Sequence, residues 1–343
     1  MTNAQFYPDT VPIIFASDNN YLPYMSATIQ SVMENSSQNR KYIFYVLHKE
    51  IRAETMDLLK KQVSLFPQFS IEFINVSHYM SKYNLFISRH ITVETYFRFL
   101  IPELFAEYKK VIYLDCDMIL CADIAELFDI NLENHLLAAM RDIDVANGCY
   151  SPEYSEDKKK FSHRQLLSEL KNPGEYFCAG MCVFNIELFR KTISVDELFE
   201  IAVSRKWDYH DQDILNYVAE GKIFLLSYHW GFYNTNLTKH LPKYLQNEYI
   251  DAEKNPKIIH FIRKPWTRQT YMPHFESFWK YATRTPFIDV IIERMKSNGF
   301  IPKEISFEKI IISNIKQREG IGIKFILFDC IKAWLFREKQ KKI

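Results

Sequence analysis

The chain has 343 residues, of which 48% are hydrophobic, 25% charged and 15% aromatic. This composition predicts a folded protein large enough for one big α/β domain with appendages, and it excludes a disordered chain. The formal net charge of +1 gives no overall field that would attract nucleic acid, so no nucleic-acid partner is expected.

Apolar, β-rich runs alternate with helix-period segments through the first two-thirds of the chain. Strands are expected over residues 11–17, 42–48, 71–76, 111–115, 181–186, 222–226 and 257–261, and helices over 24–37, 53–66, 93–105 and 195–207. The alternation predicts an α/β fold in which helices cover a mostly parallel mixed sheet. Ligands of such sheets bind beyond the carboxyl ends of the strands.

The cysteines and the first residues predict a cytoplasmic protein. Six cysteines include no C-x-x-C pair, and most lie in or beside apolar runs, where a reduced thiol acts as a small hydrophobe. The opening "MTNAQFYPDT" lacks the basic and apolar regions of a secretory signal, so none is expected.

A D-x-D motif, Asp115–Cys116–Asp117, follows the apolar strand expected over residues 111–115. Alternate positions of an extended segment place both carboxylates on one side. Such charges leave water only at high cost unless a cation or several hydrogen-bond donors compensate them. Two convergent carboxylates suit Mg²⁺ or Mn²⁺ held together with a diphosphate. The alternative is a pair of surface aspartates that cap a helix.

Haloacid-dehalogenase-type phosphatases also carry an aspartate pair after an apolar strand. Their first aspartate is the nucleophile and their second is a general acid. In that class the pair normally ends the first strand, and Thr or Val follows two residues after the second aspartate. Here the pair stands at positions 115 and 117, with Ile119 after it. The phosphatase is therefore kept only as an alternative function.

Six blocks of sequence follow one another in order between about Val11 and Trp266. They are IIFASDNNYLPYMSATIQSV, RHITVETYFRFLIPEL, YLDCDMIL, YFCAGMCVFNI, DQDILN and HFIRKPW. Together they resemble the family 8 glycosyltransferases, which use nucleotide sugars and retain the anomeric configuration. The chain is most similar to the bacterial lipopolysaccharide galactosyl- and glucosyltransferases of that family.

The resemblance implies a GT-A-like nucleotide-binding fold and a metal-dependent transferase. The donor would be UDP-galactose or UDP-glucose, which differ at one hydroxyl that no motif here distinguishes. The acceptor would be a glycan or a lipid-linked glycan such as lipopolysaccharide or another surface polysaccharide.

The resemblance also implies donor-site and metal-site residues. The donor-binding positions are Ala16, Asp18, Asn20, Arg98, Asp142, Ala179, Gly180 and Lys264, and the metal ligands are Asp115, Asp117 and His260. Two carboxylates and an imidazole leave room around one octahedral Mn²⁺ or Mg²⁺ ion for two diphosphate oxygens. Lys264 would offset the charge of the leaving diphosphate. For His260, a core histidine on an apolar strand is the alternative.

Asp211 and Gln212 match the reaction-centre positions of the family. An amide is a poor nucleophile, so Gln212 fits a group that supports same-face attack through an oxocarbenium-like transition state. A covalent double displacement would require a nucleophile. Asp211 would position the sugar, and capping of the following helix is a compatible role. His90 and Thr95 match positions on the acceptor side, with exposed helix residues as the alternative.

Two departures from the family pattern concern the donor site. Cys178 stands where the family has an asparagine, which weakens any inference about the sugar. Only four steps separate His260 from Lys264, where the family usually has six with a glycine between. Arg263 is therefore an alternative phosphate contact. A nucleotide-sugar-binding protein without turnover is the non-enzymatic alternative.

The C-terminal part differs in composition from the rest of the chain. We expect a glycosyltransferase domain over residues 1–275 and a C-terminal helical region over 276–343. Residues 301–343 hold ten Lys or Arg against five Asp or Glu, and within them residues 321–343 predict an amphipathic helix with a basic edge. Such a helix fits peripheral contact with the inner face of the cell membrane, and packing on the domain or on a second copy is the alternative.

Overall fold

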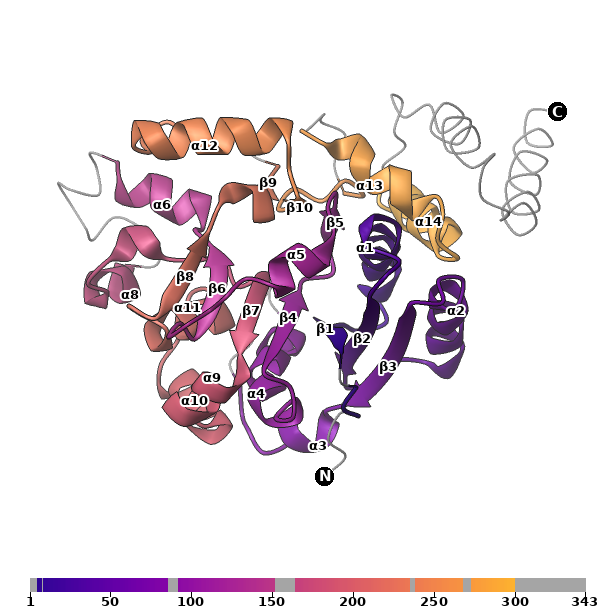
Figure 1. Cartoon of the computed structure of the whole chain (residues 1–343), viewed down its shortest axis with the longest axis horizontal. Helices are drawn as coiled ribbons and strands as arrows, with labels where there is room; N and C mark the ends of the chain where they lie inside the picture. Colours follow the sequence, from indigo (N-terminus) through magenta and orange to yellow (C-terminus); the bar gives the residue numbers. More distant parts are fainter. Residues whose placement is uncertain are drawn as a thin grey trace.

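Seven strands form one mixed sheet at the centre of the computed structural model (Figure 1). The structure describes residues 5–7, 9–85, 92–151, 164–234, 238–267 and 273–299. The strands are β1 (Thr10–Ala16), β2 (Lys41–His48), β3 (Phe69–Asn75), β4 (Lys110–Leu114), β6 (Leu137–Met140), β7 (Met181–Asn185) and β8 (Ile223–Leu226). Their order is β3-β2-β1-β4-β7-β6-β8, and β7 runs antiparallel to both neighbours while the other pairs are parallel. The predicted mostly parallel mixed sheet is confirmed.

Helices cover both faces of this sheet because its strands are apolar on both sides. In β1, Ile13 and Phe15 pack into one hydrophobic cluster, whereas Ile14 and Ala16 pack into another on the opposite face. The cluster with Ile13 and Phe15 also contains side chains of α1 (Leu22–Asn35), α2 (Ala53–Val63) and α5 (Ile124–Phe128). The second includes η1 (Val93–Leu100), α4 (Ile101–Leu104), α9 (Ile186–Thr192), α10 (Val195–Ser204) and α11 (His210–Val218).

A second, three-stranded sheet lies beside the first. It contains β5 (Met118–Leu120), β10 (Ile258–His260) and β9 (Phe232–Tyr233), with β10 antiparallel to β5 and parallel to β9. Its own core includes side chains of α12 (Lys243–Lys254), α13 (Phe275–Ala282) and α14 (Ile288–Ser297). The remaining elements are α3 (Ser77–Met80), α6 (Ile143–Cys149), α8 (Arg164–Glu169), η3 (Pro173–Glu175) and η4 (Tyr228–Trp230). Because β4 belongs to one sheet and β5 to the other, the D-x-D motif lies at their junction.

The segment expected as one helix over residues 93–105 is divided in two. A 3₁₀ helix ends at Leu100, and the short helix α4 begins at Ile101 with Pro102 in its first turn. Proline lacks the amide hydrogen and clashes with the carbonyl group four residues before it, here that of Arg98. The Arg98 carbonyl instead accepts a hydrogen bond from the Ile101 amide.

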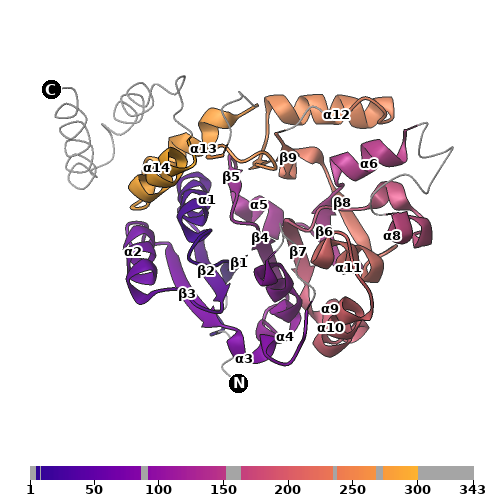
Figure 2. The same ribbon diagram turned by 180° about the vertical axis from the view of Figure 1, so that it is seen from behind.

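The C-terminal helices α13 and α14 lie beside α1 in both views of the molecule (Figure 2). The division at residue 275 stays a prediction. The basic stretch over residues 301–343, with the amphipathic helix predicted for 321–343, lies outside the described residues, as does His90. None of the helices in the described ranges combines the length and the hydropathy that a bilayer crossing requires.

Candidate active site and metal centre

Polar residues gather at one edge of the large sheet. β1, β4 and β6 run in the same direction, and Asp18, Asp115 and Asp142 follow their carboxyl ends. β7 runs the other way, so its amino end, preceded by Ala179 and Gly180, lies at the same edge. The expected placement of aspartates beyond the ends of β1 and β4 is confirmed, at the edge where ligands of such sheets bind.

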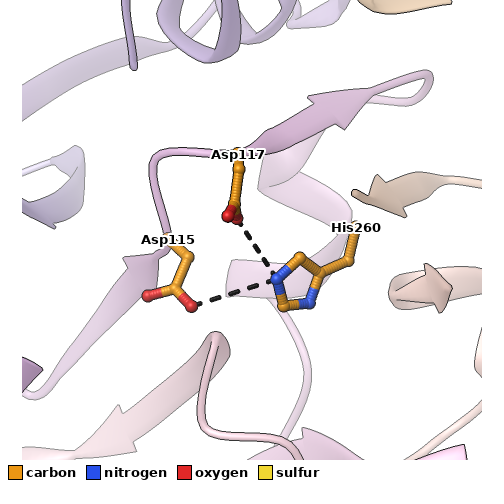
Figure 3. A group of neighbouring side chains, drawn as sticks. All are labelled: Asp115, Asp117 and His260. Atoms are coloured by element: carbon orange, nitrogen blue, oxygen red, sulfur yellow. Dashed lines mark ion pairs between the residues drawn. The ribbon is translucent and has the colours of Figure 1, made fainter. Parts of the chain in front are cut away.

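Asp115, Asp117 and His260 converge at the junction of the two sheets (Figure 3). One ligand atom from each lies within 4.8 Å of the others. His260 Nε2 is 3.2 Å from Asp117 Oδ1 and 4.0 Å from Asp115 Oδ2. The pairing of β10 with β5 sets this geometry, because it places His260 opposite Met118, the residue after Asp117.

We call the group formed by Asp115, Asp117 and His260 the cradle. The absence of a side chain at position 180 keeps the space beside it open. A Cβ atom on Gly180 would lie 2.7 Å from Asp115 Oδ2 and 2.7 Å from His260 Cε1, closer than real Cβ contacts allow. Two carboxylates and an imidazole form a donor set that fits a divalent cation such as Mn²⁺ or Mg²⁺. The three residues and the space beside them can therefore hold a metal ion.

Asp117 is paired with a cation from the protein itself. Its side chain is only 8% exposed, and Lys264 Nζ donates a hydrogen bond to its Oδ2 atom. Burial alone would raise the pKa of Asp117, but Lys264 and His260 outweigh it and hold that pKa well below its usual range. In His260, burial lowers the pKa, whereas the partners Asp117 and Cys178 raise it to about 10. The shortened loop still brings Lys264, the predicted residue, to the cradle.

Asp115 is paired with Arg98, a guanidinium that is 5% exposed. Arg98 Nη2 lies 3.1 Å from Asp115 Oδ1, and the Tyr113 hydroxyl donates to the same oxygen at 3.0 Å. On its other side Arg98 Nε lies 2.9 Å from Asp211 Oδ2, while its Nη1 donates to the Ala179 carbonyl. Burial disfavours the charged guanidinium, but Asp211 and then Tyr113 and Asp115 raise the pKa of Arg98 above its ordinary value.

Asp211, predicted for the reaction centre, and Thr95, predicted for the acceptor side, are neighbours in space. The Thr95 hydroxyl donates a hydrogen bond to Asp211 Oδ1, so both carboxylate oxygens have partners. Asp211 lies in the first turn of α11 and is buried. Arg98 thus connects a metal-ligand candidate, Asp115, to a reaction-centre candidate, Asp211.

Gln212 lies between Ala179, in the segment before β7, and Asp142. Its Oε1 atom accepts from the Ala179 amide at 3.0 Å, and its Nε2 atom donates to Asp142 Oδ2 at 3.1 Å. The Tyr233 hydroxyl donates to the same Asp142 oxygen at 3.1 Å, and the other oxygen caps α6. Burial raises the pKa of Asp142, opposed by these donors. The amide of Gln212 is thus held in one orientation at both ends.

The loop after β1 is folded around Asp18. Asp18 Oδ1 accepts from the amides of Asn20 and Tyr21 at 2.9 and 2.7 Å, and Asn20 Nδ2 donates to Asp18 Oδ2 at 3.0 Å. The carbonyl of Ala16 accepts a hydrogen bond from the Cys116 thiol at 3.2 Å, which joins this loop to the D-x-D motif. Ala16, Asp18 and Asn20, three of the predicted donor-binding residues, therefore lie together beside the cradle.

Comparison with known families decides what kind of protein this geometry belongs to. The family described as "Glycosyl transferase family 8" matches residues 12–270, which include every element that builds the site. The chain belongs to glycosyl transferase family 8. It is therefore an enzyme that transfers glycosyl groups, and the phosphatase alternative is not favoured.

Curated relatives in this family come from several bacteria. General stress protein A of Bacillus subtilis is 26% identical over 285 residues, which cover 80% of this chain and 93% of the relative. Lipopolysaccharide 1,2-glucosyltransferase of Escherichia coli is 23% identical over 272 residues, covering 75% of this chain and 74% of the relative. A putative glycosyltransferase of Haemophilus influenzae is 29% identical, and the match spans 66% of this chain but only 64% of the relative.

Solved structures of family members have the same fold. The bifunctional glycosyltransferase WbbM superposes with a TM-score of 0.73 and 27% identity, over 85% of this chain and 52% of that one. The galactosyltransferase LgtC, solved with donor and acceptor sugar analogues, gives a TM-score of 0.65 and 22% identity, over 80% and 96% of the two chains. The expected GT-A fold is confirmed.

Cys178 occupies the position at which the family pattern has an asparagine. Its sulfur is 3.8 Å from His260 Nδ1 and accepts a hydrogen bond from the Gly180 amide at 3.3 Å. The thiol therefore contacts the ring nitrogen that does not face the carboxylates, the position from which a neighbouring group orients a ligand histidine.

Three tyrosine hydroxyls contribute to the site, and those of Tyr113 and Tyr176 were not predicted from the sequence. Tyr113 donates to Asp115, Tyr233 donates to Asp142, and Tyr176 accepts from Gln212 Nε2 at 3.3 Å while donating to Asp213 at 2.6 Å. The contact of Tyr113 with Asp115 could have been predicted from the sequence, because residues two apart in a strand share a face. The other two come from distant segments that only the fold brings together.

Proposed function

We propose that the protein is a metal-dependent, retaining hexosyltransferase that moves galactose or glucose from a UDP-sugar to a glycan acceptor. The observation that carries the proposal is the convergence of Asp115, Asp117 and His260 beside Lys264, within a family 8 fold. Among solved relatives, LgtC is a galactosyltransferase described with donor and acceptor sugar analogues, which supports a sugar-nucleotide donor.

Asp115, Asp117 and His260 would hold Mn²⁺ or Mg²⁺. A divalent ion in this position supplies positive charge to a diphosphate leaving group. The binding of a cation requires the neutral imidazole, so His260 would give up a proton on metal binding. Lys264 would release Asp117 when the cradle is loaded, and its ammonium would then face the leaving diphosphate.

Asp18 and Asn20 would hold the nucleoside, because they lie in the loop after β1 beside the cradle. The sugar would lie between this loop and the pair formed by Asp142 and Gln212. The buried carboxylate of Asp142 can accept a sugar hydroxyl, and its hydrogen bonds fix its position before the donor arrives. Arg98 acts here through Asp115 and Asp211, since its three nitrogens already donate to protein groups.

Gln212 would support attack on the same face that the diphosphate leaves. Its amide contacts the Ala179 amide and the Asp142 carboxylate, so its dipole is fixed beside the proposed sugar site. An uncharged amide in that place can stabilise positive charge at the anomeric carbon without forming a covalent bond. Asp211 is bound to Arg98 and Thr95, which suits a positioning role.

The proposed acceptor is a lipopolysaccharide or another surface glycan. The support is a relative named lipopolysaccharide 1,2-glucosyltransferase, together with the basic sequence of residues 301–343 and the amphipathic pattern of residues 321–343. A basic segment of this kind would bring the enzyme to an anionic membrane surface, where a lipid-linked acceptor is found.

One experiment tests the proposal directly. The full chain is incubated with Mn²⁺ and a panel of UDP-sugars, with and without a glycan acceptor, and released UDP is measured. We expect donor-selective release that EDTA abolishes and added Mn²⁺ restores. Release that is insensitive to EDTA would contradict the metal assignment. Binding of UDP without release from any donor of the panel would contradict the proposed transfer of galactose or glucose.

A further inference from the structure

Two helices beyond the matched family region contact both loops that the proposed function assigns to the donor. The family match ends at residue 270, and α13 begins at Phe275. We name residues 17–21 the nucleotide loop and residues 261–267 the Lys264 loop. α13 and α14 pack against α1, whose first residue follows the nucleotide loop directly.

The attachment of these helices to the end of α1 is strong. Arg284 Nη1 lies 2.7 Å from Glu34 Oε2, and the two side chains are 4% and 19% exposed. Asn35 Nδ2 donates to the Tyr281 hydroxyl at 2.9 Å and to the Leu120 carbonyl of β5 at 3.0 Å. This partly buried ion pair and these shared hydrogen bonds position the helices relative to α1 and to the small sheet.

At the start of α1, Arg294 of α14 reaches the nucleotide loop. Its Nη1 atom donates a hydrogen bond to the backbone carbonyl of Asn20, and its guanidinium lies 5.8 Å from the centre of the Tyr24 ring. Asn20 also binds the Asp18 side chain through its own amide groups. Arg294 therefore holds the loop from outside, at the residue that closes it around Asp18.

The Lys264 loop is held from the same side. Trp266, two residues after Lys264, stacks on Tyr24 with ring centres 3.9 Å apart and planes at 9°, and its other neighbour is Phe278 of α13 at 4.7 Å. The Thr267 amide donates to the Lys264 carbonyl at 3.1 Å and closes the turn that carries the ammonium. Trp266 is 4% exposed and Phe278 is 1% exposed, so this ring cluster is part of the core.

We propose that α13 and α14 form a brace that positions the nucleotide loop through Arg294 and the Lys264 loop through Phe278 and Trp266. Arg294 and Phe278 are positioning residues, since they act through groups that contact the donor. The inference rests on the proposed function in its assignment of these loops to the UDP-sugar. It predicts that residues outside the matched region contribute to donor affinity.

The test uses the full chain with Arg294→Ala and Arg294→Lys, and with Arg190→Ala as a control. Arg190 is exposed in the last turn of α9, on another part of the molecule. We expect Arg294→Ala to raise the Kd for UDP and the KM for the UDP-sugar about fivefold to tenfold, with kcat changed less than twofold. Arg294→Lys should restore part of the affinity, and Arg190→Ala should match the wild type.

Hydrogen exchange separates bracing from a general loss of stability. In Arg294→Ala, amides of residues 18–24 should exchange faster while those of β2 and β4 are unchanged. Phe278→Leu, which keeps most of the buried volume, should speed exchange in the Lys264 loop instead. Unchanged UDP affinity and unchanged exchange in Arg294→Ala would overturn the brace. A wild-type chain that neither binds UDP nor transfers sugar would overturn the proposed function, while faster loop exchange in the variant would still support the brace.

Discussion

The two aspartates of the cradle stand two residues apart, yet different parts of the molecule hold them. Asp115 follows a strand of the large sheet, is 29% exposed, and is paired with Arg98, which is 5% exposed. Asp117 precedes a strand of the small sheet, is 8% exposed, and is paired with Lys264, which is 25% exposed. The more exposed carboxylate thus has the buried cation, and the buried carboxylate has the more accessible one.

The difference suggests two roles: Arg98 is a fixed positive charge, whereas Lys264 is a positive charge that a metal ion can replace. Arg98 also binds Asp211, so its departure would leave two carboxylates without a paired cation. Lys264 binds Asp117 alone among the ion pairs found in the described residues, and it lies on a loop, so its flexible side chain can move away. A metal ion can therefore replace Lys264 at Asp117 without disturbing the pairing at Asp115.

The largest effect is expected from Asp117→Asn. The substitution removes one of the two carboxylates, and a neutral amide is a weak ligand for a hard divalent cation, so turnover should fall by about three orders of magnitude. Released UDP and Mn²⁺ binding are the measurements. The control is Asp129→Asn, which removes an exposed carboxylate paired with Arg40. Activity within tenfold of the wild type would contradict the assignment of Asp117.

Arg98→Met should destabilise the metal-free protein by about 3–5 kcal/mol, because it leaves Asp115 and Asp211 without their cation. Urea denaturation measures the change in the free energy of unfolding. The matched control is Arg40→Met, whose pair with Asp129 is exposed and should contribute less than about 1 kcal/mol. Equal losses in the two variants would show that Arg98 is not the fixed charge of the site.

Lys264→Met should separate metal binding from catalysis. Without the competing ammonium, Asp117 is free to bind a cation, so Mn²⁺ affinity in the absence of nucleotide should rise several-fold. The same change should lower kcat by about tenfold to a hundredfold, because charge on the leaving diphosphate is less well stabilised. Calorimetry and UDP release give the two values, with Lys257→Met, which loses an exposed pair with Glu126, as the control. Weaker Mn²⁺ binding would contradict an exchangeable Lys264.

The sequence was sufficient to predict the alternating core of the fold and the aspartates at its edge. The strands β1, β2 and β4 have near-continuous apolar runs, whose period and flanking residues are local properties. β6 was missed because its four residues include the paired alanines Ala138 and Ala139, which have weak strand preference. The antiparallel direction of β7 could not be predicted, because the apolar pattern of a strand does not indicate the direction in which it pairs.

The sequence was sufficient to predict which residues belong to the candidate site, but it did not predict which of them contact one another. Family resemblance selected Arg98 and Asp211, but local pattern says nothing of the ion pair between residues 113 positions apart. The same limit applies to Tyr233 and Asp142. Arg98 can be buried because Asp115, Asp211 and the Ala179 carbonyl compensate its charge. These partners lie after β4, in α11 and before β7, and only the tertiary structure brings them together.

The reversed direction of β7 has a consequence for how this enzyme can change. Three consecutive residues before the strand each contact a different part of the site: Cys178 contacts His260, Ala179 contacts Gln212 and Arg98, and the Gly180 carbonyl accepts from the Asp115 amide at 2.7 Å. An insertion or deletion here would displace the metal cradle and the reaction centre together. Within this segment, side chains can therefore be substituted, whereas its length has to be preserved.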